Sequence, residues 1–125
     1  MFEITINGTV YGLKFGIGFV KEVSGRRKIT LDNGMKEDAG LEYAIAKIQE
    51  GDILTLVDVL DLGNKYAGEP RLTRSVIEGY LEDENTDIER LFDDVLGFFE
   101  KSNATKKKVK MIKEATEAAE KAQQK

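Results

Sequence analysis

Residues 2–13 alternate between apolar and polar side chains with the two-residue period of a β-strand. In FEITINGTVYGL, apolar residues take every second position up to Ile6, and the strand pattern resumes after Asn7-Gly8. Asn-Gly is a preferred dipeptide of the tight type I′ turn, which matches the twist of two antiparallel strands. The pattern therefore predicts an antiparallel hairpin over residues 2–13.

Beyond residue 39 the apolar residues recur at the spacing of amphipathic helices. The first stripe ends at Gly51 and comprises Leu41, Ala44, Ile45 and Ile48. Asp52 is a suitable N-cap for the next helix, whose apolar residues cover more than one face. Those residues are Ile53, Leu54, Leu56, Val57, Val59, Leu60 and Leu62. We expect this helix to lie at the centre of the fold.

Two further stripes predict helices in the second half of the chain. Pro70 lies in the clearest loop, and Thr73 is a suitable N-cap after it. Thr86 and Glu89 have the spacing of a capping box ahead of the second stripe. The stripes comprise Val76, Ile77, Tyr80 and Leu81, and then Ile88, Leu91, Phe92, Val95 and Phe99. Leu96 and Phe98 fall on opposite shoulders of the second stripe, so we expect one of them to face a partner.

Two segments fit neither period closely. Residues 14–23 partly match helical spacing, although Gly16 and Gly18 each weaken a helix by about 1 kcal/mol relative to alanine. We expect a helix there, with glycines that let it lie close to the sheet. Residues 24–39 contain a short alternating stretch and a second Asn-Gly dipeptide. A third strand and an exposed excursion both fit that segment.

These elements predict an α+β fold that is mostly α. An N-terminal antiparallel β-hairpin, possibly with a third strand, packs on a bundle of about five helices. We expect residues 1–104 to form a single globular domain, with the helical bundle at residues 39–101. Residues 105–125 are rich in lysine and alanine and poor in large apolar side chains, which predicts a C-terminal helix that is partly frayed. A chain of 125 residues can bury roughly two thirds of its unfolded surface, so one core is expected.

The composition narrows the possible chemistry. The chain has no histidine and no cysteine, which excludes disulfides, thiolate nucleophiles, zinc sites built from these residues and a histidine proton shuttle. No apolar run approaches the ~20 residues of a membrane helix, and Glu3 and Asn7 interrupt any leader-like pattern at the N-terminus. We therefore expect a cytoplasmic protein with no membrane partner.

The motifs that would indicate a cofactor, a metal or a catalytic site are incomplete. Gly16 and Gly18 begin a dinucleotide fingerprint, but Lys21 stands where its third glycine belongs, and no G-K-[ST] motif occurs. A calcium loop over residues 83–94 fails at Ile88, where glycine is needed. The carboxylate pairs Asp58–Asp61 and Asp93–Asp94 lie on polar helix faces. We expect no catalytic residue, cofactor or metal, with a carboxylate-dependent hydrolase as an unsupported alternative.

The charges separate into two blocks along the second half of the chain. Acids dominate residues 78–100 and lysines dominate residues 101–113, within a formal net charge of -4. We predict that partner contacts come from Leu96, Phe98, Lys106, Lys107, Lys108 and Lys110. The alternative is a small nucleic-acid-associated regulator that uses the same lysines. This reading is less favoured, because the lysines lack interleaved aromatic residues that would stack on bases.

The order and spacing of these segments resemble the tail assembly chaperones of long-tailed bacteriophages and of prophages of Gram-positive bacteria. The resemblance rests on the opening hairpin followed by LKFGIGF, then GLEYAIAKIQEGD leading into LTLVDVL, then DIERLFDDVLGFFEKSNATKKKVK. It extends to about residue 113. The chain departs from the family pattern near Ala46, where a proline is expected, and in the loop over residues 26–38.

The resemblance implies a non-enzymatic assembly factor. Such chaperones bind the tape measure protein, keep it soluble and help tail tube protein polymerise around it. They act in the host bacterial cytoplasm and are not retained in the mature virion. The resemblance also implies a frameshifted longer form of the chain as a partner, and self-association into a homo-oligomer.

Overall fold

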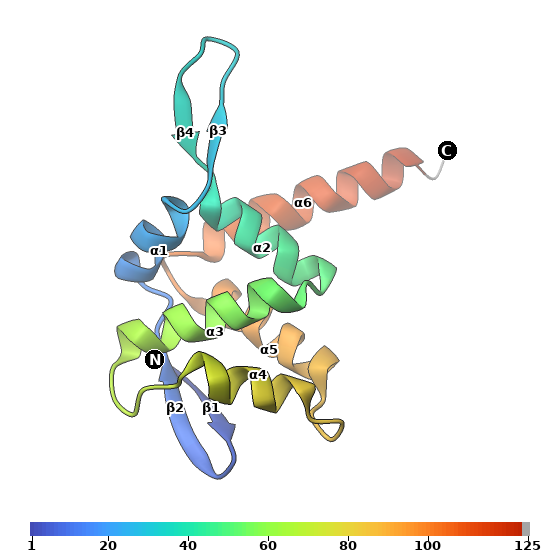
Figure 1. Ribbon diagram of the computed structural model, residues 1–125. Coiled ribbons are helices and arrows are strands. Elements are labelled where there is room, and N and C mark those ends of the chain that lie inside the picture. The colour runs from blue at the N-terminus through green and yellow to red at the C-terminus, as the bar shows by residue number, and fades with distance from the viewer. Residues whose placement is uncertain (124–125) are drawn as a thin grey trace.

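The computed structural model describes residues 1–123. It shows a helical body from which the segment over residues 28–38 and the C-terminal helix project (Figure 1). Its first half contains β1 (Phe2–Ile6), β2 (Thr9–Leu13), α1 (Ile17–Ser24), β3 (Lys28–Thr30) and β4 (Lys36–Asp38). Its second part contains α2 (Gly40–Glu50), α3 (Ile53–Ala67), α4 (Arg74–Glu82), α5 (Ile88–Lys101) and α6 (Lys106–Gln123). The fold is α+β and mostly α, which confirms the predicted class.

The N-terminal hairpin has the predicted bounds and turn. Strands β1 and β2 pair antiparallel from Phe2 opposite Leu13 to Ile6 opposite Thr9. Both central turn residues have positive φ, 53° at Asn7 and 80° at the following glycine, as a type I′ turn requires. Ile6 and Leu13 are fully buried, so one face of the hairpin lies against the helices.

Helix α3 lies at the centre of the fold, as predicted. It packs against α1, α2, α4 and β2, and Leu56 and Leu60, one turn apart on the same face, are fully buried. Leu54 is the exception, because its side chain is 73% exposed. Leu54 lies two residues before Leu56, which places the two side chains about 200° apart around the helix.

A cluster of phenylalanine rings joins the hairpin to the helices. The Phe15 ring meets the rings of Phe19 and Phe99 edge-on, each at a centroid distance of 4.9 Å. Phe98 of α5 stacks on Phe2 of β1 at 4.6 Å. These aromatic contacts bring β1, α1 and α5 together around one side chain from the β2–α1 connection.

Asn64 is a buried polar side chain on α3 that joins three segments. Its amide nitrogen donates hydrogen bonds to the carbonyl oxygens of Gly12 and Pro70, both at 3.1 Å. Its Oδ1 accepts hydrogen bonds from the backbone N–H of Leu72 at 2.6 Å and from the Arg71 guanidinium at 2.7 Å. All the hydrogen-bonding capacity of the amide is thus used to hold β2, α3 and the α3–α4 loop together.

Two of the predicted helix caps are present. The Asp52 carboxylate accepts hydrogen bonds from the backbone N–H of Thr55 at 3.0 Å and from its hydroxyl at 2.6 Å. Thr73 Oγ1 accepts a hydrogen bond from the backbone N–H of Val76 at 3.3 Å. Each cap satisfies a backbone donor at a helix start that would otherwise have no partner.

The predicted capping box of Thr86 and Glu89 is wrong. Asp87 is the N-cap of α5, and its Oδ1 accepts a hydrogen bond from the backbone N–H of Arg90 at 3.1 Å. The Thr86 hydroxyl instead donates to the carbonyl oxygen of Tyr80 at 2.7 Å, near the end of α4. Asp87 serves as the cap because its short carboxylate lies next to the first helical residue.

Helix α1 begins at Ile17, three residues later than the sequence suggested, because Phe15 enters the core before the helix starts. A Cβ on Gly18 would lie 2.6 Å from the ring of Tyr66 on α3. The expectation that the α1 glycines allow close packing on the sheet is therefore wrong for Gly18, which packs on α3.

Residues 25–38 form the exposed excursion and not a third strand of the first sheet. Strands β3 and β4 pair only with each other, from Lys28 opposite Asp38 to Thr30 opposite Lys36. Every residue from 25 to 38 is exposed. We call this hairpin, which projects from the body beside α1 and α2 in Figure 1, the arm.

Helix α6 is anchored at its start. Thr105 and Val109 are buried, and Lys108 Nζ lies 2.9 Å from a carboxylate oxygen of Glu42 on α2. The rest of α6 extends away from the body (Figure 1). The predicted boundary at residue 104 stays a prediction, and the predicted fraying falls partly on residues 124–125, which lie outside the described residues.

We predict opposite effects for two Gly→Ala substitutions inside helices. At Gly63 of α3 a Cβ would lie 2.6 Å from the buried Phe15 ring, whereas at Gly79 of α4 nothing lies within 4 Å. Overpacking at Gly63 exceeds the gain in helix propensity, so Gly63→Ala is expected to lower the free energy of unfolding by about 1–2 kcal/mol. Gly79→Ala is expected to raise it by up to about 1 kcal/mol. Urea denaturation measures both, and equal effects would contradict the close packing of Phe15.

A second prediction concerns the ion pair between Glu42 and Lys108. Burial raises the pKa of the Glu42 carboxyl, but the hydrogen bond from Lys108, a backbone hydrogen bond at Glu42 and the charge of Lys108 together outweigh this effect and hold the pKa below its ordinary value. The pair therefore stabilises the fold at neutral pH, and its contribution is lost as the pH falls through that lowered pKa. Both side chains are more than one third exposed, so the coupling is expected to be below about 1 kcal/mol.

A double-mutant cycle with Glu42→Gln and Lys108→Gln tests this ion pair. Urea denaturation measures the coupling free energy between the two side chains. The coupling is expected to be favourable at pH 7 and to vanish in acid. The charge-swapped double variant Glu42→Lys with Lys108→Glu is the matched control, and it should keep most of the stability. Coupling that is the same at both pH values would show that the contact is not electrostatic.

Candidate partner-binding surfaces

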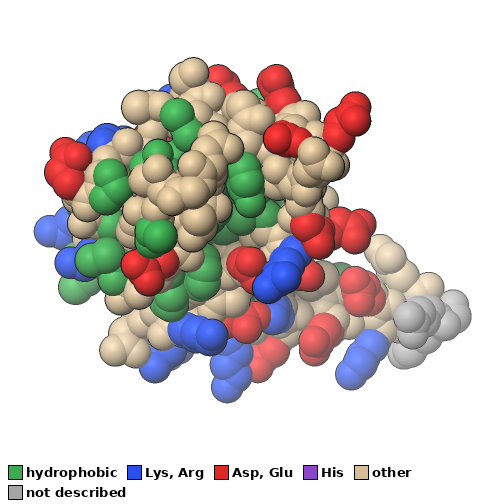
Figure 2. All heavy atoms as spheres, turned by 90° about the horizontal axis from the view of Figure 1, so that it is seen from below, with side chains coloured by type: hydrophobic (Ala, Val, Ile, Leu, Met, Phe, Trp, Pro, Cys, Tyr) green, Lys and Arg blue, Asp and Glu red, His purple; other side chains and the backbone are tan. Residues whose placement is uncertain are grey.

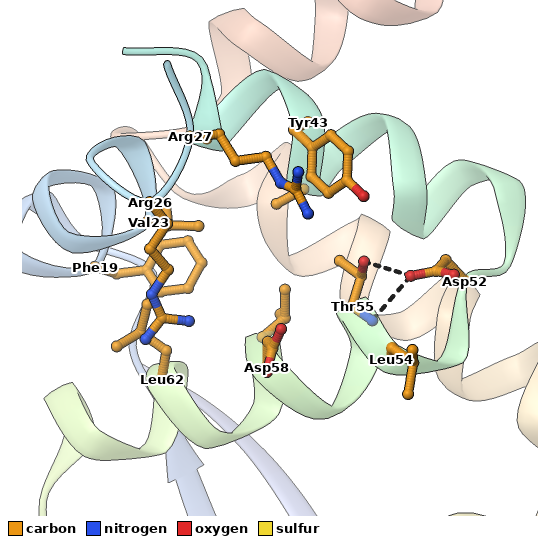
Figure 3. Close-up of a pocket in the computed structure, with 13 residues that line it drawn as sticks. Phe19, Val23, Arg26, Arg27, Tyr43, Asp52, Leu54, Thr55, Asp58 and Leu62 are labelled. Atoms are coloured by element: carbon orange, nitrogen blue, oxygen red, sulfur yellow. Dashed lines mark hydrogen bonds between the residues drawn. The ribbon is translucent and has the colours of Figure 1, made fainter.

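A groove of about 530 Å³ opens between α1, α2 and α3 (Figure 3). Its floor is apolar and includes Phe19 and Val23 of α1, Ala44 of α2, and Val59 and Leu62 of α3. Its rim carries Arg26, Arg27, Tyr43, Asp52, Leu54 and Asp58. The groove therefore combines an apolar floor with a charged rim.

The close approach of Gly40 to Val23 shapes this groove. A Cβ on Gly40 would lie only 1.7 Å from the carbonyl oxygen of Val23, so glycine is required at the first position of α2. The end of α1 and the start of α2 thus touch, and residues 25–39 leave and re-enter the body at one point. We call this point the neck of the arm.

The two sides of the groove carry opposite charges. Figure 3 shows Arg26 and Arg27 at the α1 side of the groove, Asp52 at the start of α3 and Asp58 on α3. The Arg27 guanidinium lies 3.6 Å above the ring centroid of Tyr43, in a cation–π contact beside the groove. On the opposite side, hydrogen bonds from the Thr55 hydroxyl and backbone N–H lower the pKa of Asp52, which keeps its carboxylate ionised.

The paired carboxylates on α3 form ion pairs with arginines. Asp58 lies 2.7 Å from the Arg74 guanidinium, and Asp61 lies 3.2 Å from the same group. Asp61 also pairs with Arg71 at 2.7 Å. These contacts hold α4 and the preceding loop against α3, which is a structural role. Within residues 1–123, no cluster of three or more acidic side chains is placed to hold a metal ion.

Leu96 and Phe98 lie on different sides of α5 and are half-buried against the core. Phe98 lines a shallow depression with Ile4 of β1. Leu96 lines another depression with Ile48 and Phe92, near the end of α2. The structure thus places the two predicted contact residues on separate surfaces.

The four predicted lysines do not all share one surface. Lys106, Lys107 and Lys110 line an exposed depression along α6, and we call these three lysines the lysine face. Lys113 and three acids, Glu100, Glu114 and Glu117, line the same depression. Lys108 instead points to Glu42, as described above. Figure 2 shows charged side chains of both signs along the segment leading to the C-terminus, and hydrophobic side chains gathered on the body.

The sequence reasoning missed the groove. It assigned Leu54 to the core and Asp52 only to a cap, and it gave no role to Arg27 or Tyr43. The sequence does contain one indication that Leu54 is exposed, because helical spacing places it on a different face from Leu56 and Leu60. The meeting of α1 with α2 at the neck depends on contacts between distant residues, which a local pattern does not reveal.

Comparison with known proteins identifies the family. A family model described as "Phage tail assembly chaperone protein, TAC" matches residues 3–114, which include β1 from its second residue, every element from β2 to α5 and the first half of α6. No curated protein and no solved structure gives a match. Among residues 1–123, no helix combines the length and the apolar character needed to cross a membrane. The chain therefore belongs to the phage tail assembly chaperone family.

Proposed function

We propose that this chain binds the tape measure protein of a phage tail, keeps it soluble and promotes polymerisation of tail tube protein around it. The observation that carries the proposal is the family match, which spans the groove, the arm and the lysine face. Such a role places the chain in the host cytoplasm during assembly and outside the finished virion. The tail tube protein, a frameshifted longer form of the chain and further copies of the chain are its other proposed partners.

The surface chemistry supports a binding role. Apolar side chains beside the groove can cover apolar stripes of a helical partner, which would otherwise associate with one another in water. The carboxylates on α3 are engaged with arginines, which supports a non-enzymatic function. Binding of this kind requires exposed apolar and charged groups and no reacting group.

The lysine face supplies the electrostatic part of the proposal. Lys106, Lys107 and Lys110 lie together on an exposed part of α6, next to its anchored start. Positive charges on an exposed surface accelerate the encounter with an acidic partner and lose this effect at high salt. We propose that the lysine face attracts acidic segments of the tape measure protein. Lys108 is left out of this set because it bridges α6 to α2.

Co-expression with the tape measure protein tests the proposed function. The wild-type chain is expected to keep the tape measure protein in the soluble fraction and to be captured with it. The triple variant Lys106→Glu, Lys107→Glu, Lys110→Glu is expected to bind several-fold more weakly at low salt, with a smaller difference at high salt.

The matched control replaces the same three lysines with arginine, which keeps the charge and should keep the binding. Equal capture by the glutamate variant at low salt would remove the lysine face from the proposal. A tape measure protein that is equally soluble without the chain would overturn the proposed function. Steeply salt-dependent binding of the wild type to duplex DNA, with no capture of tape measure protein, would favour a nucleic-acid role.

A further inference from the structure

The chain contains two Asn-Gly dipeptides, and both lie at exposed hairpin turns. Asn7-Gly8 joins β1 to β2, and Asn33-Gly34 lies at the tip of the arm. Asparagine before glycine is prone to spontaneous loss of its side-chain amide, because glycine has no side chain to keep its backbone nitrogen away from the amide carbon. The two dipeptides are chemically identical, so a difference in their reactivity must come from the fold.

At the tip of the arm, a hydrogen-bond donor lies on the amide of Asn33. The Met35 backbone N–H donates to Asn33 Oδ1 at 2.9 Å. Attack on the amide carbon places negative charge on this same oxygen, and a donor already in place stabilises that charge. The attacking group is the Gly34 backbone nitrogen, whose N–H donates to the Leu31 carbonyl oxygen at 2.9 Å. This bond must open before the nitrogen can reach the amide carbon.

Few contacts hold the turn of the arm closed. Every residue from 25 to 38 is exposed, and a Cβ on Gly34 would meet no atom within 4 Å. The strands of the arm have three residues each, and a two-stranded hairpin of this kind is marginally stable by itself. Opening the tip of the arm therefore breaks backbone hydrogen bonds but removes no side chain from the core.

The turn between β1 and β2 is held more firmly. Ile6 directly precedes Asn7 and is fully buried, as is Leu13 at the other end of the hairpin. The strands have five residues each, and β2 packs on α3. Opening this turn disturbs Ile6 in the core, so its local opening costs more free energy than opening of the arm.

The other three asparagines are poorer candidates. Asn64 is buried, and both ends of its amide are used in hydrogen bonds. Asn85 and Asn103 are exposed, but Thr86 and Ala104 follow them. A side chain on the following residue hinders the approach of its nitrogen to the amide carbon, which glycine allows.

We propose that Asn33 is a site of spontaneous deamidation and the first residue of the folded chain to be modified in this way. The Gly34 nitrogen forms a bond to the Asn33 amide carbon, the bond from that carbon to the side-chain nitrogen breaks, and the proton lost by Gly34 leaves with ammonia. Water then opens the cyclic succinimide at either carbonyl carbon and gives aspartate or isoaspartate. No atom is oxidised or reduced, and water is the only co-reactant.

The modification changes the arm and leaves the body as it was. Both products add one negative charge at the tip of the arm. The aspartate form keeps an oxygen that can accept the Met35 N–H. In the isoaspartate form the main chain runs through the former side chain and is longer by one carbon atom, so the turn closed by Gly34 and Leu31 no longer fits. This inference does not depend on the proposed binding of tape measure protein.

The test incubates the full chain in neutral buffer and follows deamidation by peptide mass spectrometry. Trypsin cuts after lysine and arginine, so the two sites fall in separate peptides, residues 1–14 and 29–36. In the folded chain, Asn33 is expected to lose its amide at least about tenfold faster than Asn7. In concentrated urea the two rates are expected to agree within about twofold, because neither turn is then held by the fold. A folded chain in which Asn7 reacts as fast as Asn33 would overturn the inference.

A cross-linked arm is the matched control for the role of local opening. Thr30 lies opposite Lys36, so the double variant Thr30→Cys with Lys36→Cys can form a disulfide across the arm. The wild-type chain has no cysteine that could compete. The oxidised variant is expected to deamidate at Asn33 at least about threefold more slowly than the same variant reduced, with the rate at Asn7 unchanged. Equal rates at Asn33 in the two forms would mean that opening of the arm does not control the reaction, and the inference would fail.

Discussion

The seating of Phe15 against Gly63 is the contact on which the rest of the structure depends. The Phe15 ring fills the space that a side chain at position 63 would occupy, and the neighbouring Lys14 N–H donates to the Gly63 carbonyl oxygen at 2.9 Å. The Phe15 carbonyl oxygen accepts a hydrogen bond from the Ser102 hydroxyl at 2.5 Å, just after α5. One residue between β2 and α1 therefore fixes the hairpin, the central helix and the start of the C-terminal segment relative to one another.

The features predicted correctly from the sequence are those decided by neighbouring residues. The Asn7-Gly8 turn requires positive φ at two adjacent positions. Asp52 caps α3 through a hydrogen bond from the backbone N–H of Thr55, only three residues further along the chain. The helical stripes were visible for the same reason, because their period is a property of a single helix. Family resemblance added the functional class, which local patterns alone left open between a binding module and a nucleic-acid regulator.

The features that were missed depend on residues far apart in the chain. Asn64 looks like an ordinary polar position near the end of an apolar helix. Its four hydrogen bonds nevertheless reach two other segments, β2 and the α3–α4 loop, which meet α3 here only in the folded state. The groove depends on the contact between Val23 and Gly40, and the late start of α1 depends on Phe15 entering the core. Lys108 could not be separated from its neighbouring lysines, because Glu42 lies 66 positions earlier in the sequence.

The neck of the arm has a consequence for how such a protein can change. The chain leaves the body after Val23 and returns at Gly40, two positions in direct contact. Adding residues between ends that are already held together costs little free energy, since loop-closure entropy grows only slowly with length. Exposed tips of this kind also tolerate insertion well. The body could therefore carry arms of different length and composition on the same core.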